Sequence, residues 1–193
     1  MQVGTRRAAS AIHPIKELNS MIYKKYFVLA WLLAFMAVVP AMAQAPQHTP
    51  ELEFVLQLKV TLGQAYSLGD TPNGRRTVIP ITGGTFEGPL LKGTIINGGA
   101  DYQLADPKTN RTTLEAIYSI KTDDGVYIHV RNKGIIHSEQ NGGGQPSFYF
   151  KAAPQFEAPS DSPYAWLNNA IYVCEPAFDS AFQGIVLNVW KVK

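Results

Sequence analysis

The sequence predicts an all-β domain, folded as a closed antiparallel barrel or as a sandwich. Residues 52–62 alternate apolar and polar side chains, which is the pattern of a strand with one buried face. Short alternating segments follow it, separated by turns rich in glycine and proline, and no long helical period appears after residue 43. Many short strands with turn signals between them are typical of barrels and sandwiches.

Residues 21–43 are predicted to be a cleavable signal peptide. Lys24 and Lys25 precede an uncharged apolar stretch, Tyr26–Val39, which ends at a proline followed by Ala-Met-Ala. A membrane-spanning helix needs about 20 apolar residues, so this shorter stretch fits a signal better than an anchor. We expect cleavage after Ala43, export to the periplasm or the medium, and no stable membrane span afterwards. Residues 1–20 are interpreted as a leader or as sequence ahead of a start at Met21.

Removal of the signal reverses the sign of the net charge. The whole chain has a formal charge of +2, from 17 Lys and Arg against 15 Asp and Glu. After residue 43, 12 basic and 14 acidic residues remain, which gives −2. No basic cluster is left beyond Arg75-Arg76, so the composition argues against nucleic acid as a partner. Cys174 is the single cysteine, which excludes an internal disulfide, and its apolar neighbours predict a buried thiol.

Residues 44–51 form a tether rich in proline and glutamine, and residues 52–193 are predicted to be the barrel domain. Further strands are expected at 77–82, 90–96, 135–138, 148–156, 171–175 and 184–193, with a short helical turn at 164–169. Residues 69–76 are predicted to be a loop, and residues 141–146 a glycine-rich connection. The glycines and prolines between 83 and 89 are expected to mark a bulge or a sharp corner.

A β-hairpin is predicted around the turn Asp123-Asp124-Gly125, because alternating segments flank it and glycine accepts a positive φ. The expected pairs are Ile120 with Ile128, Tyr118 with Val130, Ser119 with His129, and Glu115 with Lys133.

The sequence contains no Gly-x-Ser-x-Gly elbow, phosphate loop, His-Glu-x-x-His or Cys-x-x-Cys motif. This weakens hydrolase and metalloenzyme assignments, and neither a cofactor nor a metal site is predicted.

A carboxylate and a phenol lie side by side in Gly98-Gly99-Ala100-Asp101-Tyr102, at a predicted strand start. A buried Asp101 would act as a general base or orient a polar ligand. The alternative, which the usual behaviour of aspartate favours, is a turn in which Asp101 accepts hydrogen bonds from backbone N–H groups.

The polar face of the hairpin carries Glu115, Ser119, Tyr127, His129 and Arg131. Inside a barrel, this face would gather an acid, an imidazole and a cation for proton transfer. Small barrels usually fill with their apolar face, so a solvated polar face is the favoured interpretation.

Two further features are candidate ligand contacts. Arg75 lies beside Asn73-Gly74, where a basic loop would close over an anion, although ordinary surface arginines are the favoured alternative. Trp166 belongs to an aromatic set that would wall an apolar pocket, with core packing as the default for most members.

Several separated motifs make residues 52–192 similar to the domain of unknown function 3237 family, also called uncharacterised protein family 0311. The motifs are Gly74-Arg75, Gly83-Gly84-Thr85-Phe86-Glu87-Gly88-Pro89, Gly98-Gly99-Ala100-Asp101-Tyr102, Thr122-Asp123-Asp124-Gly125, Phe150 with Pro154 and Phe156-Glu157, and Trp166-Leu167-Asn168. The resemblance implies a single lipocalin-like β-barrel and no established activity. The family pattern carries tryptophan and arginine where this chain has Tyr102 and Ile117.

These features together predict an exported β-barrel that binds a small, partly apolar molecule inside, with Asp101, Tyr102 and His129 as polar anchors. The alternative is a cofactor-independent isomerase, lyase or cyclase that uses Asp101 or Glu115 as base and Tyr102 or His129 as acid. A third interpretation is an interaction module with an exposed aromatic patch. The sequence does not indicate an oligomeric state.

Overall fold

The computed structural model describes residues 48–139, 147–179 and 181–193. Within them lie strands β1 (Leu52–Leu62), β2 (Tyr66–Thr71), β3 (Gly74–Glu87), β4 (Lys92–Ile95), β5 (Gly99–Asp106), β6 (Arg111–Thr122), β7 (Tyr127–Glu139), β8 (Ser147–Glu157), β9 (Tyr172–Ala177) and β10 (Gly184–Val192), and the short 3-10 helix η1 (Ala165–Asn169). None of the described residues belongs to a helix that is long and apolar enough to span a membrane. The predicted leader, signal, cleavage site and glycine-rich connection lie outside the described residues.

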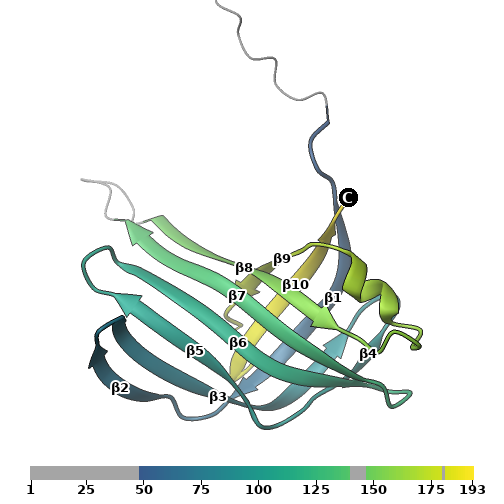
Figure 1. Cartoon of the computed structure of the whole chain (residues 1–193), viewed down its shortest axis with the longest axis horizontal. Coiled ribbons are helices and arrows are strands. Elements are labelled where there is room, and N and C mark those ends of the chain that lie inside the picture. The colour runs from purple at the N-terminus through teal and green to yellow at the C-terminus, as the bar shows by residue number, and fades with distance from the viewer. Residues whose placement is uncertain (1–47, 140–146, 180) are drawn as a thin grey trace, which may run out of the picture. The chain divides into compact units, whose positions relative to one another are not determined.

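The strands close into an antiparallel barrel (Figure 1). From β6 to β10 each strand pairs with the next, β10 pairs with β1, and β1 pairs with β3. β4 and β5 both lie between β3 and β6 and complete a ring eight strands around in the described chain. β2 lies off this ring, as the hairpin partner of β3. The predicted all-β barrel is confirmed, and the sandwich alternative is wrong.

β6 and β7 form the predicted hairpin, and all four predicted side-chain pairs are present. The even-numbered side chains of both strands point inward, so Tyr118, Ile120, Ile128 and Val130 are buried in the core. The odd-numbered polar face therefore points away from the core. This orientation follows from the period of two, because burying one face of a strand exposes the other.

Two predicted breaks are instead part of continuous strands. The predicted loop at 69–76 is a hairpin, in which β2 and β3 pair around a tight turn. The strand predicted to end at residue 82 continues through Gly83 and Gly84, with φ values of 142° and 131°. The expected bulge is present beside them, because the register between β1 and β3 shifts between Ile81 and Gly83. Here β3 passes from pairing with β2 and β5 to pairing with β1 and β4. The glycines allow the strand to change partners without ending.

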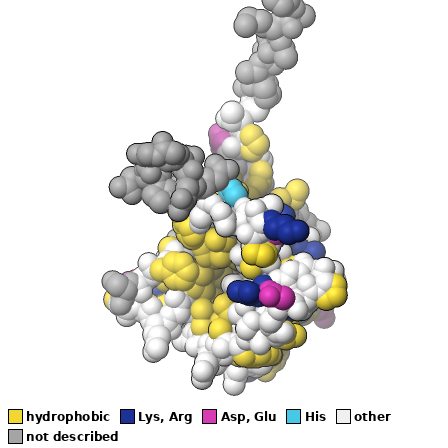
Figure 2. All heavy atoms as spheres, turned by 90° about the vertical axis from the view of Figure 1, so that its left-hand side faces the viewer, with side chains coloured by type: hydrophobic (Ala, Val, Ile, Leu, Met, Phe, Trp, Pro, Cys, Tyr) yellow, Lys and Arg dark blue, Asp and Glu magenta, His cyan; other side chains and the backbone are white. Residues whose placement is uncertain are grey.

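The two ends of the barrel differ. At one end η1 packs on the core through Leu167, and the Tyr164 hydroxyl donates to the Asp124 carboxylate at 2.9 Å, which ties η1 to the β6–β7 turn. The β2–β3 and β5–β6 turns lie at the opposite end (Figure 1). Figure 2 looks at that end and shows a recess lined by hydrophobic side chains. The barrel is thus plugged by η1 at one end and hollowed at the other.

Candidate functional site

An interior cavity of about 110 Å³ lies toward the hollowed end of the barrel. Most of its wall is aliphatic or aromatic. The lining residues are Val60, Leu62, Ile79, Ile81, Asp101, Gln103, Leu114, Ala116, Tyr118, Asn132, Ile136, Phe150, Pro176, Phe178, Ile185 and Leu187. A concave apolar space with a few polar groups is the usual form of a small-molecule site.

β5 directs Asp101 into this cavity. Asp101 pairs with Ile79 of β3 on one side and with Ala116 of β6 on the other, so it lies within the sheet and not in a turn. Close packing at the strand start needs Gly99, where a Cβ atom would lie 2.5 Å from the Ile117 carbonyl oxygen. The interpretation of Asp101 as a turn residue is wrong, because pairing on both sides holds its backbone extended.

The carboxyl group of Asp101 is only partly satisfied. Its Oδ2 accepts a hydrogen bond from Gln103 Nε2 at 2.8 Å, whereas its Oδ1 is buried and has no hydrogen-bond partner. Burial raises the pKa of Asp101 above its ordinary value, and the hydrogen bonds from Gln103 and from the Glu115 backbone N–H offset this only in part. A carboxyl group in such surroundings tends to keep its proton and to exchange it with a bound molecule.

Asn132 is another polar residue in the cavity lining, along with Asp101, Gln103 and Tyr118. It is 3% exposed, its side chain partly offsets the rise that burial causes in the pKa of Cys174, and its Oδ1 has no hydrogen-bond partner. Buried amide groups usually have partners for both the donor and the acceptor. Asp101 and Asn132 therefore both present an unpartnered acceptor oxygen in one largely apolar space.

Cys174 is buried beside this cluster, as predicted, and burial raises the pKa of its thiol to about 12. The thiolate is the reactive form, so native protein is expected to react with iodoacetamide at least about 100-fold more slowly at pH 8 than unfolded protein does. Mass spectrometry of the alkylated chain over time measures this ratio. Equal rates for native and unfolded protein would contradict the buried, protonated thiol.

The other predicted site residues do not join Asp101. Tyr102, Glu115 and His129 lie on the outer face of the sheet, since their positions alternate with inward-facing ones. Arg75 is exposed on the β2–β3 hairpin and pairs with Asp70, its Nε 3.0 Å from Oδ1. Trp166 belongs to η1 and packs against the core at the plugged end.

Sequence reasoning missed Gln103 and Asn132. Asn132 had a usable signal, because it occupies an even-numbered position of β7 between Val130 and Gly134, on the face that the hairpin pattern predicts to be buried. A polar side chain on a predicted apolar face indicates either a buried hydrogen-bond network or a site.

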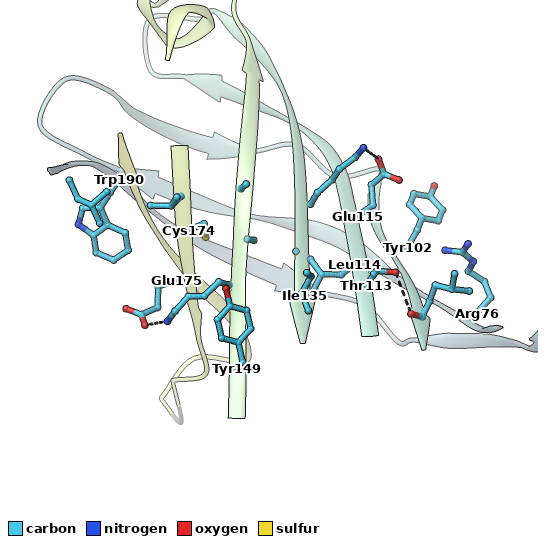
Figure 3. A pocket seen from close by; sticks show the side chains of 18 residues that line it. Arg76, Tyr102, Thr113, Leu114, Glu115, Ile135, Tyr149, Cys174, Glu175 and Trp190 are labelled. Atoms are coloured by element: carbon cyan, nitrogen blue, oxygen red, sulfur yellow. Dashed lines mark hydrogen bonds and ion pairs between the residues drawn. The ribbon is translucent and has the colours of Figure 1, made fainter. Parts of the chain in front are cut away.

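A larger groove, of about 910 Å³, runs across the outer face of the sheet. Figure 3 shows Tyr102, Glu115, Ile135 and Glu175 along it, with both glutamates in ion pairs. Glu115 pairs with Lys133 at 3.8 Å and also with Arg131, and Glu175 pairs with Lys151. Among the described residues that line the groove, none carries a buried polar side-chain atom without a partner. The smaller interior cavity is therefore the better candidate site.

The chain is similar in sequence and in structure to known proteins. The family model described as "Protein of unknown function (DUF3237)" matches residues 50–192. A UPF0311 protein of Rhodopseudomonas palustris is 33% identical over 136 residues, covering 65% of this chain and 88% of the relative. The crystal structure of a beta-barrel like protein from Acinetobacter baumannii matches with a TM-score of 0.66 and 33% identity, over 78% of this chain and 100% of that one.

One relative has a name that states a reaction. The "hydroalkoxylation enzyme phnH" of Penicillium herquei is 31% identical over 145 residues, which cover 75% of this chain and 85% of the relative.

Proposed function

This chain belongs to the DUF3237 family, and we propose that it is a cofactor-independent enzyme that uses Asp101 to move protons on a small, partly apolar molecule inside the barrel. The observation that carries this proposal is the Oδ1 atom of Asp101, which is buried in the wall of an apolar cavity without a partner. Structural aspartates are normally paired or hydrogen-bonded through both oxygens, so an unpartnered one is a functional candidate.

The surroundings of Asp101 suit proton transfer. Its raised pKa brings the carboxyl group nearer to neutral pH, where both its acid and its base forms are useful. Gln103 holds one oxygen in place and leaves the other free to face a bound molecule. The apolar walls accommodate the hydrocarbon part of that molecule and keep bulk water away from the carboxyl group.

The reaction class that we propose is addition of a hydroxyl group across a carbon–carbon double bond, as the name of the fungal relative suggests. The carboxyl group of Asp101 gives its proton to one alkene carbon, and the π electrons form the new C–H bond. The substrate oxygen forms a C–O bond to the other carbon with a lone pair. The hydroxyl proton then passes to the Asp101 carboxylate, which restores the acid. The step needs no oxidant, reductant or metal.

A panel of hydroxyalkenes that includes 2-allylphenol, incubated with the mature protein in D₂O, tests this proposal. We expect a cyclic isomer that carries one deuterium on carbon, and a rate about 100- to 10,000-fold lower for Asp101→Asn, the usual contribution of one general acid. Asp106→Asn, an exposed position on the same strand, is the control and should retain the wild-type rate. If wild-type protein binds panel members but is no faster than Asp101→Asn, the domain is a carrier and the catalytic proposal is wrong.

We also propose that the domain acts after export, on the strength of the charged, apolar and Ala-Met-Ala segments at residues 21–43. Protein recovered from outside the cytoplasm should begin at Gln44 by N-terminal sequencing. Ala43→Leu should accumulate the uncleaved precursor, because the cleavage position requires a small side chain. Recovery of the wild-type chain in the cytoplasm with residues 21–43 still attached would contradict export.

A further inference from the structure

The free acceptor of Asn132 lies on the same row of the barrel as Asp101. The register places Asp101 of β5 opposite Ala116 of β6, and Ala116 opposite Asn132 of β7. Neighbouring strands are about 4.8 Å apart, so the Cα atoms of Asp101 and Asn132 are separated by roughly 9–10 Å. Ala116 lies between them and contributes only a methyl group. The two polar side chains therefore flank a short gap in the cavity wall.

One atom of the Asn132 side chain is available to a bound molecule. Its Oδ1 is buried and has no hydrogen-bond partner. An acceptor requires a donor, such as a hydroxyl group. Asp101 and Asn132 reach the cavity from strands that are two apart, with Ala116 between them.

We infer that Asn132 is a specificity-determining residue that binds a hydroxyl group of the substrate other than the one that reacts. The substrate class is then a ring or a short chain with at least two hydroxyl groups and an apolar portion. This inference rests on the proposed function for the reacting atoms, but the recognition by Asn132 is a matter of binding alone. A site built to accept a hydrogen bond from a hydroxyl group discriminates strongly against the analogue that lacks it, because the buried acceptor is then left unpaired.

The test compares two probes that differ by one hydroxyl group, 2-allylresorcinol and 2-allylphenol, by calorimetric titration into the mature protein. Wild type is expected to bind 2-allylresorcinol roughly 10- to 100-fold more tightly, the range expected for satisfying one buried acceptor. Asn132→Leu, of similar volume but without an acceptor, should bind both probes with equal affinity. Asp101→Asn should keep the preference, which separates failure of this inference from failure of the catalytic proposal.

Three results would overturn the inference. Wild type would bind the two probes with equal affinity, or it would not bind 2-allylresorcinol, or the preference for 2-allylresorcinol would survive in Asn132→Leu. If Asn132→Leu does not fold, the side-chain amide NMR signal of Asn132 in wild-type protein decides the question. Saturating 2-allylresorcinol should shift that signal more than saturating 2-allylphenol does, and equal shifts would contradict a hydrogen bond from the second hydroxyl group.

Discussion

Gly84→Ala is expected to destabilise the barrel by about 3–5 kcal/mol, a large part of the 5–15 kcal/mol that stabilises a typical domain. Gly84 lies where β3 pairs with β1 to close the ring, opposite Val60. A Cβ atom at this position would lie 2.0 Å from the carbonyl oxygen of Lys59, and the φ of 131° is one that L side chains rarely adopt. Because the obstacle is backbone, one of the two closing strands has to move.

Gly98→Ala is the matched control for this prediction. Gly98 also has a positive φ, 119°, but a Cβ atom there would meet nothing within 4 Å. It should therefore cost only the backbone strain, about 1–3 kcal/mol. Urea denaturation of wild type and both variants gives the two free energies of unfolding. If the two substitutions cost the same, contact with β1 is not what requires glycine at position 84.

The parts of the fold that sequence predicted well depend on neighbours in the chain. The hairpin of β6 and β7 follows from alternation on both sides of Asp123-Asp124-Gly125, and its register is fixed by that turn. The glycine pair Gly83-Gly84 carried a local signal for a bulge or a corner, which the register shift beside it matches. Its role depends on β1, more than 20 residues away in the chain, and this pairing leaves no local signal.

The candidate site was predictable only where its signals come from neighbouring residues in the chain. Asp101 was identified from its glycine-rich surroundings, but Tyr102 and Asp101 cannot both face the cavity once the segment is a strand, since neighbouring side chains point to opposite faces. Glu115 is separated from the cavity by the same alternation. The partnership with Asn132 arises only because Ala116 pairs with both residues, which requires the register of three strands.

Asp101→Asn is expected to make the protein more stable at neutral pH while removing its proposed activity. The wild-type side chain must either keep its proton or carry a charge in an apolar wall, and burial is the main cause of its raised pKa. The asparagine amide keeps an oxygen for Gln103 and has no charge to bury. A gain in stability from removing a functional group is common, because active sites often retain unfavourable groups that catalysis requires.

The pH dependence of the stability gained by Asp101→Asn shows whether burial of the carboxyl group is its cause. Since the pKa of Asp101 is higher in the folded protein than its ordinary value of 3.8, the folded state binds more protons than the unfolded chain between those two values. The stability of wild type relative to Asp101→Asn therefore decreases as pH rises through that window and stays low above it. Urea denaturation at intervals from about pH 3 to about pH 8 measures the difference.

For Asp106→Asn, a variant on the same strand, the pH dependence of stability relative to wild type is expected to have the opposite sign. Asp106 is exposed and accepts hydrogen bonds from the Lys108 N–H and the Thr109 hydroxyl, both at 2.9 Å, which lower its pKa. Its contribution to stability is present above its ordinary value of 3.8 and is lost as pH falls through the lowered value. Wild type should therefore become less stable relative to Asp106→Asn on acidification, but more stable relative to Asp101→Asn. If the difference in free energy of unfolding between wild type and Asp101→Asn does not change with pH, the buried carboxyl group has an ordinary pKa. In that case the physical argument for Asp101 as a general acid fails.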